Sequence, residues 1–396
     1  MRRPSSAGLA KGEGDAEHPS GPRVGTGAHP HAGLGVPVTS THSAVEPIAA
    51  EWDLLADRCG AVPFLRPGWI DTWWRAFGRG ALEVVAIRRD GRLVAVLPLF
   101  SRPGSLHSTT NFHTPLFGLL AEDADVARAV ASTVVSSGVR RVTVGFLDSR
   151  RPDLAELAAA GEAARRRVLV RTLARAPFLD IEGTWEAYER GLSRNLRSDT
   201  RRCWRRLAEA GRISFEIEDG STRLDELLSE GFRLEAAGWK TARGTAILSR
   251  PETERFYREV ARWAAERGWL RLAFLRVDGR PVAFHYAFED GRVYYPLKGG
   301  YDPRYREFSP GKLIIHSTLS RAFWTGLARY EFLGGEAQYK RVWASGSREI
   351  VLFQAYAASA AGFAEWTLQA YGRPLAKSGV NALRRLRGGR RGSVAE

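Results

Sequence analysis

The sequence is poor in the residues that build disulfide frameworks, structural metal sites and membrane spans. Its 396 residues include two cysteines, Cys59 and Cys203, and no Cys/His cluster accompanies either one. No uninterrupted apolar run is long enough to cross a bilayer. We therefore expect no disulfide, no metal and a cytoplasmic protein, because isolated thiols suit a reducing compartment.

An apolar signal segment is also missing near the N-terminus. Arg2 and Arg3 are followed by Gly, His, Glu and Asp where a signal peptide would be apolar. Residues 1–43 are rich in Gly, Pro, His and Ser and show no apolar periodicity. We predict that they form a disordered tail.

Arginine is abundant, and the formal net charge is +15. Residues 372–396 hold seven basic side chains and a single acidic one, Glu396, and are predicted to form a basic tail. Such a tail can make weak contact with polyanions or an anionic membrane surface. A solvated excess of arginine is the simpler interpretation, and no specific nucleic-acid partner is expected.

A first mixed α/β lobe is predicted over residues 44–192. Within Phe64–Phe77, Pro67 suits the first turn of a helix, and Trp69, Trp73 and Phe77 recur at helical spacing. These rings are interpreted as an aromatic core face. Two apolar runs flank Asp90-Gly91, the signature of a β-hairpin.

A basic helical connector is predicted over residues 193–211. Its arginines form either a solvated face or a contact for an anionic ligand between two lobes. A second lobe is predicted over residues 212–371, with elements in the order βααβββαβ and a last strand. Both lobes carry similar hairpins, so the fold class is α/β with two similar tandem lobes.

A candidate anion site follows the strand 292–297 of the second lobe. A loop is predicted from Lys298 to Pro310, and a helix follows it. Ser309 suits the N-cap and Gly311 lets an anion approach the backbone, while Arg306 or Lys312 adds positive charge. A plain capped helix is the alternative. Pro296 predicts a broken ladder on one side of the strand.

Several short motifs together resemble the GNAT acetyltransferases related to the cellulose-biosynthesis protein CelD, a branch akin to the Fem-type aminoacyl transferases. The motifs span most of the chain from Glu46 to Phe353. They are the tryptophan-rich segment Phe64–Phe77, Asn195-Leu196-Arg197, Gly238-Trp239-Lys240, Gly244-Thr245-Ala246-Ile247, Gly300-Tyr301-Asp302-Pro303, Ser309-Pro310-Gly311 and Tyr339-Lys340-Arg341-Val342-Trp343.

The resemblance implies two tandem GNAT-like lobes, with acetyl-CoA or another acyl-CoA as donor. It assigns the CoA contacts to Arg306, Ser309, Gly311 and Lys312. One departure affects these contacts, because the usual Arg/Gln-x-x-Gly-x-Gly/Ala signature is not intact around Arg306. The pantetheine arm is expected beside Pro296, where GNAT sheets splay apart.

Acyl transfer to an amine requires loss of a proton from the amine, polarisation of the thioester and protonation of the thiolate. Glu336 is the candidate base, Tyr339 the acid, and Lys340 the group that stabilises the oxyanion or binds an acidic acceptor. Trp239 and Lys240 are candidate acceptor contacts. The alternative is a structural turn, in which Tyr339 and Trp343 pack in the core.

Three functions remain open. The leading hypothesis is an N-acyltransferase that acts on a small amine, an amino sugar or a cell-envelope intermediate, in polysaccharide or envelope metabolism. A Fem-type peptidyltransferase that uses aminoacyl-tRNA is the second, and the basic charge favours it. The third is a non-catalytic binding module of envelope assembly.

Overall fold

The computed structural model describes residues 37–372 except residue 243. The first half of the chain contains β1 (Val38–His42), α1 (Ala49–Arg58), α2 (Pro67–Phe77), β2 (Ala81–Arg89), β3 (Arg92–Arg102), β4 (Ser105–Ser108), β5 (Leu120–Ala121), α3 (Ala124–Val135), β6 (Arg141–Asp148), α4 (Pro152–Ala163) and β7 (Arg167–Asp180). Within the described residues, no helix is both long and apolar enough to cross a membrane.

The second half repeats this order of elements. It contains α5 (Trp185–Gly191), α6 (Arg194–Glu209), β8 (Ile213–Glu218), α7 (Leu224–Ala236), α8 (Trp239–Ala242), α9 (Pro251–Glu266), β9 (Leu270–Val277), β10 (Arg280–Glu289), β11 (Val293–Tyr301), α10 (Pro310–Trp324), β12 (Arg329–Glu331), α11 (Gln338–Arg341), β13 (Gly346–Tyr356) and α12 (Ala360–Thr367). Apart from the two-residue strand β5 of the first half and the helices α5, α6 and α12 of the second, each half runs strand, helices, three strands, helix, strand, helix, strand. The predicted α/β fold with two similar tandem lobes is confirmed.

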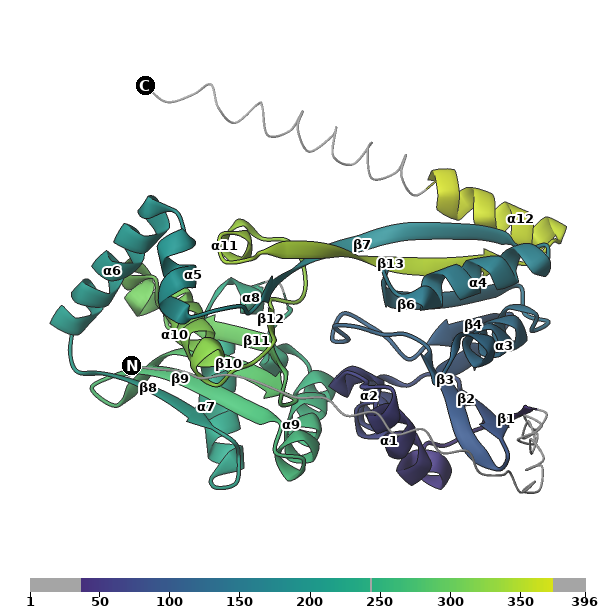
Figure 1. Ribbon diagram of the computed structural model, residues 1–396, viewed down its shortest axis with the longest axis horizontal. Coiled ribbons are helices and arrows are strands. Elements are labelled where there is room, and N and C mark those ends of the chain that lie inside the picture. Colours follow the sequence, from purple (N-terminus) through teal and green to yellow (C-terminus); the bar gives the residue numbers. More distant parts are fainter. Residues whose placement is uncertain (1–36, 243, 373–396) are drawn as a thin grey trace, which may run out of the picture. The chain divides into compact units, whose positions relative to one another are not determined.

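The two halves exchange their last strands. The sheet order is β1-β2-β3-β4-β6-β13-β7-β12-β11-β10-β9-β8. The C-terminal strand β13 is therefore inserted between β6 and β7, and the far end of β7 pairs with β12 of the second half. Figure 1 shows β7 and β13 as a long pair of strands that joins the two halves. Because both strands belong to both halves, the limits 44–192 and 212–371 stay a proposal.

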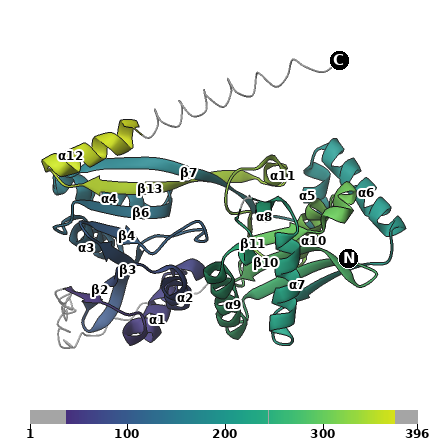
Figure 2. The same cartoon turned by 180° about the vertical axis from the view of Figure 1, so that it is seen from behind.

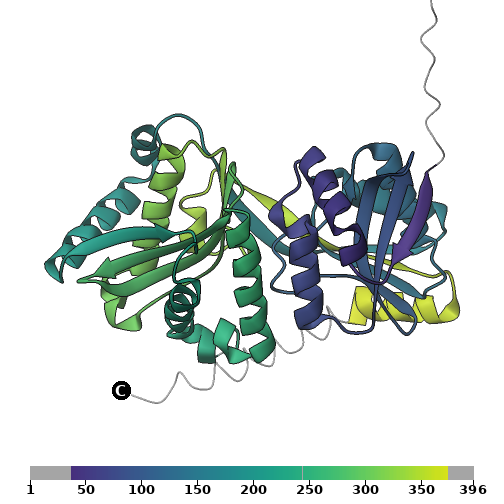
Figure 3. The ribbon, with the colours of Figure 1, turned by 90° about the horizontal axis from the view of Figure 1, so that it is seen from below.

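Aromatic side chains close the gap between helices of the two halves. Trp69 and Trp73 of α2 are buried, which confirms the predicted aromatic core face. Trp69 meets Phe256 of α9 edge-on, with ring centroids 5.2 Å apart, and Figure 3 shows α2 and α9 side by side at this junction. Such edge-on ring pairs stabilise the packing beyond what the burial of their apolar area contributes.

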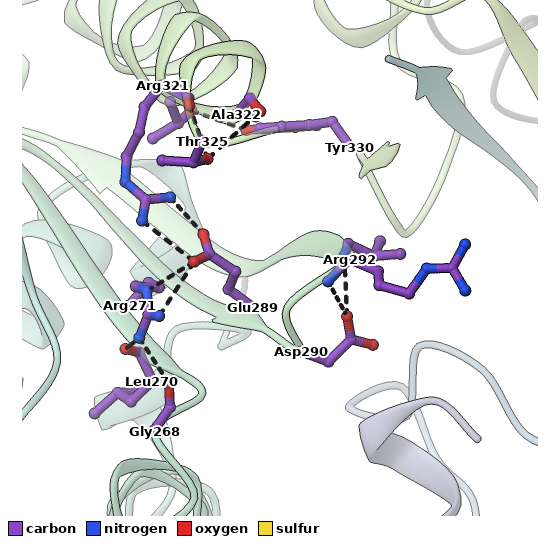
Figure 4. Close-up of polar contacts among 12 residues, drawn as sticks. Gly268, Leu270, Arg271, Glu289, Asp290, Arg292, Arg321, Ala322, Thr325 and Tyr330 are labelled. Carbon is purple, nitrogen blue, oxygen red and sulfur yellow. Dashed lines mark hydrogen bonds and ion pairs between the residues drawn. The ribbon is translucent and has the colours of Figure 1, made fainter. Parts of the chain in front are cut away.

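A buried ion cluster fixes α10 on the sheet. The carboxylate of Glu289, at the end of β10, accepts hydrogen bonds from Arg271 of β9 and Arg321 of α10 (Figure 4). The Arg271 Nε to Glu289 Oε1 distance is 3.2 Å. Because Glu289 is 7% exposed, its charge is compensated by the two guanidinium groups rather than by water.

Three sequence predictions are corrected. Residues Val38–His42 of the predicted tail form β1, an edge strand paired with β2. The predicted loop from Lys298 to Pro310 is instead the end of β11 and a 3-10 helix, Pro303–Phe308. Helix α12, which was not predicted, packs beside β7 and β13 (Figure 2). Residues 1–36 and 373–396 of the two predicted tails lie outside the described residues.

Candidate functional site

A cavity of about 500 Å³ lies between the two halves. We call it the interlobe cavity. Its lining comes from strands β3, β4, β6, β7, β11 and β13, from helix α9, and from the loop after β4 and the turn after β12. The lining residues are Phe100, His107, Ser108, Thr110, Asn111, Phe112, His113, Thr114, Pro115, Thr143, Gly145, Phe146, Leu173, Ala174, Tyr257, Leu297, Lys298, Leu333, Gly334, Gly335, Ile350 and Leu352.

The cavity opens where two parallel strands separate. Strands β11 and β12 pair only at Val293–Arg329 and Tyr294–Tyr330, so the ladder ends two residues before Pro296, as the proline predicted. On the other side, the register of β10 and β11 shifts so that Leu297 has no partner in the ladder. A bulge of this kind re-aims backbone groups and is frequent beside active sites. Because of the gap and the bulge, β11 has backbone groups at the cavity that are not paired with a neighbouring strand.

Two lining residues hold an unfavourable backbone conformation. Phe146 has φ 60° and Leu333 has φ 52°, in the left-handed region that bulky side chains avoid. Such strain costs about 1–3 kcal/mol per residue and is concentrated at functional sites. Its occurrence at two positions of one cavity supports a functional role for the cavity.

A cluster of lysines surrounds the end of β11. The Lys240 ammonium of α8 is 3.0 Å from the buried Glu235 carboxylate and also donates to the Gly299 carbonyl. The second Glu235 oxygen accepts from the backbone N–H of Ile247 at 2.8 Å. Lys240 thus ties α7 and α8 to β11.

Two glycines allow this close approach of helix and strand. A Cβ on Gly300 would lie 2.5 Å from the Leu234 carbonyl oxygen of α7, and one on Gly299 would lie 2.7 Å from the His285 ring. Within β11, Gly300 therefore serves the packing of helix α7, and Gly299 makes room for the His285 side chain of the neighbouring strand β10.

Lys340 holds the strained turn of the cavity. Its ammonium donates to the Leu333 carbonyl oxygen at 2.7 Å. Burial, together with the nearby charge of Lys240, lowers the pKa of Lys340 to about 8. The contact that Lys340 makes is with the backbone, and its role on an oxyanion stays a prediction.

Lys298 is the lysine that lines the cavity. None of the described residues forms a hydrogen bond or ion pair with its ammonium, which lies 5.3 Å from the centre of the Tyr257 ring. Burial lowers the pKa of Lys298 to about 8. The charge of Glu235 opposes this shift, and the charge of Lys240 adds to it. At neutral pH it is therefore a cation without an anionic partner.

Two neutral histidines also line the cavity. Burial and the charges of Lys298 and Arg250 lower the pKa of His113 to about 3, and the Nδ1 atom of His113 lies 3.2 Å from the Tyr257 hydroxyl. Burial and two arginines likewise lower the pKa of His107 to about 4. Since the lining described above includes no acidic residue, Lys298 sets the sign of the potential inside the cavity.

The predicted donor loop lies at the start of α10. Ser309 occupies the N-cap position of α10 as predicted, but its side chain makes no capping hydrogen bond and its φ is 52°. Ser309 nevertheless takes the left-handed conformation that glycine favours, at the first glycine position of the signature Arg-x-x-Gly-x-Gly. Gly311 follows in the first turn.

The two predicted cations of this loop differ. The Lys312 ammonium pairs with the carboxylate of Asp199 on α6 and lies 3.6 Å from the Cys203 sulfur. Arg306 is exposed, and none of the described residues pairs with its guanidinium. Arg306 is thus the more available of the two for binding an anion.

The remaining predicted residues lie outside the cavity lining. Glu336 is exposed, directly after Gly335, and Tyr339 of α11 is 60% exposed. The alternative that packed Tyr339 in the core is therefore wrong, while Trp343 is buried as that alternative required. Trp239 begins α8, and its side chain lies outside the described part of the structure.

Sequence reasoning missed Lys298, although a compositional signal pointed to it. The six lysines of the chain are Lys11, Lys240, Lys298, Lys312, Lys340 and Lys377, against a basic surface made of arginine. All four lysines of the described region lie around the end of β11 or the start of α10. A lysine ammonium is a compact charge, which suits the narrow space at the end of this strand better than a guanidinium does.

Comparison with known proteins agrees with this geometry. Residues 194–341 match a family described as "Acetyltransferase (GNAT) domain", which includes α6, the β11–β12 gap and the α10 loop. No curated protein matches the chain closely enough to count as a relative.

Solved structures share the fold at low identity. FemX is 12% identical, with a TM-score of 0.55 over 83% of this chain and 99% of that one. A conserved protein of unknown function from Bacteroides thetaiotaomicron is 12% identical, with a TM-score of 0.50 over 78% and 97%. A tandem GNAT protein from the clavulanic acid biosynthesis pathway is 13% identical, with a TM-score of 0.44 over 82% and 100%. Residues 194–341 are therefore similar to a GNAT acetyltransferase domain, and relatedness to CelD is not shown.

Proposed function

We propose that this protein is an N-acyltransferase that moves an acetyl or other acyl group from acyl-CoA to an amine acceptor. The observation that carries the proposal is the gap between β11 and β12, which opens directly into the interlobe cavity. A thioester arm lying in this gap would present its carbonyl to an acceptor held in the cavity. The match to a GNAT acetyltransferase domain over the same elements supports this arrangement.

The donor phosphates are proposed to bind at the start of α10. A helix N-terminus offers unpaired backbone N–H groups and a partial positive charge. Gly311 leaves room for an anion there, and the exposed Arg306 supplies a full charge. Lys312 contributes once it leaves Asp199, because its ammonium is held by that carboxylate.

The reaction itself requires that the amine nitrogen attack the thioester carbon, that the C–S bond break and that the thiolate take up a proton. The bulge at Leu297 offers a backbone N–H for the developing oxyanion. Glu336, directly or through water, is proposed as the base and Tyr339 as the acid for the thiolate. Lys340 is proposed to hold the Leu333 turn in place through its hydrogen bond.

The acyl donor can be identified without knowledge of the acceptor. Native mass spectrometry of the protein purified from its host is expected to reveal a bound CoA species. Added acetyl-CoA should also raise the melting temperature, since a ligand that binds only the folded state stabilises it. A protein that neither carries CoA nor responds to acetyl-CoA would contradict the proposal.

A Fem-type transfer from aminoacyl-tRNA is the second candidate, and helix α6 favours it. This helix presents six arginines, Arg194, Arg197, Arg201, Arg202, Arg205 and Arg206, of which Arg202 pairs with Asp199, Arg205 with Glu209 and Arg206 with Glu307. An arginine-rich helix next to the proposed donor loop suits a polyanionic donor. Salt-sensitive binding of aminoacyl-tRNA without binding of acetyl-CoA would favour this candidate. Envelope intermediates as acceptors, and weak polyanion contact through residues 372–396, remain further proposals.

A further inference from the structure

We infer that the interlobe cavity binds an amino-acid-like compound. Its carboxylate pairs with the Lys298 ammonium, and its apolar body lies against the apolar side chains at the rim of the cavity. That this compound is the acyl acceptor rests on the proposed function. The carboxylate site itself stands on the geometry of the cavity.

The charge of the cavity is the first argument. Lys298 points to a cavity with no acidic lining residue, and no described side chain pairs with its ammonium. Glu235, the nearest acid that affects Lys298, is already bonded to Lys240 and to the Ile247 N–H. Lys298 is half-buried, so its unpaired charge is only partly solvated, and a bound carboxylate would supply the missing counter-charge.

The apolar rim is the second argument. Phe112, at the tip of the loop after β4, is 97% exposed, and Leu173 of β7 is 45% exposed. Both line the cavity together with Phe146, Leu297 and Leu352. Exposed apolar side chains gathered at the mouth of a cavity mark a binding site for an apolar group.

Hydroxyl groups provide the third argument. The Thr143 Oγ1 atom is buried and has no hydrogen-bond partner among the described residues. The Ser108 hydroxyl lies 2.8 Å from that of Thr110. A buried hydroxyl without a partner is rare in folded proteins, and a polar group of the ligand would satisfy it. At about 500 Å³, the cavity has the size of a site for a small ligand.

Matched neutral and anionic probes test the carboxylate contact. Isothermal titration of the full chain with 3-phenylpropionate and 3-phenylpropionamide isolates the charge, because the two probes share one apolar body. We expect the acid to bind about tenfold more tightly or better, as one charge-assisted hydrogen bond predicts. Lys298→Met should bring the ratio of the two dissociation constants close to one, and Lys298→Arg should keep a preference for the acid.

The control variant is Arg212→Met, which removes an exposed cation beside the edge strand β8. It should bind both probes as the wild-type protein does. A preference for the acid that survives in Lys298→Met overturns the inference, and so does a wild-type protein that does not prefer the acid. Melting curves of each variant show that it is folded.

A parallel measurement separates this inference from the proposed function. Release of CoA thiol from acetyl-CoA is followed with L-phenylalanine as acceptor, and acetyl-CoA binding is titrated alone. Binding of the acid through Lys298 without any binding of acetyl-CoA overturns the proposed function alone. Binding of acetyl-CoA without a preference for the acid overturns the carboxylate site alone.

Discussion

Replacing Lys298 by methionine should stabilise the folded protein at neutral pH. Burial lowers the pKa of Lys298 from 10.5 to about 8, a difference of about 2.5. At about 1.4 kcal/mol per pKa unit, the folded state disfavours the charged form by roughly 3 kcal/mol. The contact with the Tyr257 ring offsets part of this cost, so we expect Lys298→Met to gain roughly 1–2 kcal/mol at pH 7.5.

The gain should shrink as the pH rises. Because the folded-state pKa of this base is lower than that of the unfolded chain, the unfolded state holds more protons between about pH 8 and pH 10.5. The stability of the wild-type protein therefore rises with pH across this window, by roughly 2 kcal/mol from pH 7.5 to pH 9.5 for this lysine. The advantage of Lys298→Met should fall by the same amount.

Denaturant titrations at the two pH values measure both effects. Lys340→Met is the matched comparison, since burial also lowers the pKa of Lys340 to about 8. Its ammonium, however, donates to the Leu333 carbonyl oxygen, and loss of such a bond costs roughly 1.5–3 kcal/mol. Lys340→Met should therefore gain nothing at pH 7.5. A Lys298→Met variant that is less stable than wild type, or a pH-independent difference, would refute the reasoning.

Three further predictions concern packing, charge and catalysis. Gly300→Ala should lower the melting temperature strongly, because the new Cβ would lie 2.5 Å from the backbone of α7, whereas Gly238→Ala, with open space around it, should not. Glu289→Gln should cost roughly 1.5–3 kcal/mol in denaturant titrations, because it leaves two partly buried arginines without a full counter-charge; equal midpoints would argue against the cluster. Tyr339→Phe should lower turnover with little change in donor affinity if its hydroxyl protonates the thiolate, and unchanged steady-state kinetics would exclude that role.

Local patterns predicted the elements of this fold, and their pairing depended on distant parts of the chain. Helical spacing of aromatic rings located α2, and the Asp-Gly turns located the hairpins. The exchange of β7 and β13 between the halves could not be read from local sequence, because no residue pattern states which strand is the neighbour of β6. The edge strand β1 lacks alternating apolar residues and was therefore assigned to the tail.

The candidate site was predicted only in part. The loop from Arg306 to Lys312 precedes α10 as predicted, but the ion pair of Lys312 with Asp199 joins residues far apart in sequence. Lys298 was placed in a loop, because the strand β11 continues through a glycine pair that normally ends strands. The pairing of both glycines with β10 and the packing of α7 on Gly300 account for the longer strand.

The central claim is that acyl-CoA binds along the β11–β12 gap with its phosphates at the start of α10. The most direct test is a calorimetric titration of acetyl-CoA into the wild-type protein and Gly311→Val. An added Cβ at Gly311 would lie 3.4 Å from the Tyr301 ring, so it barely crowds the fold but fills the space in front of the backbone N–H groups. We expect the Kd for acetyl-CoA to rise at least about tenfold in Gly311→Val, with the melting temperature unchanged. Equal Kd values, or no binding of acetyl-CoA to the wild-type protein, would contradict the account.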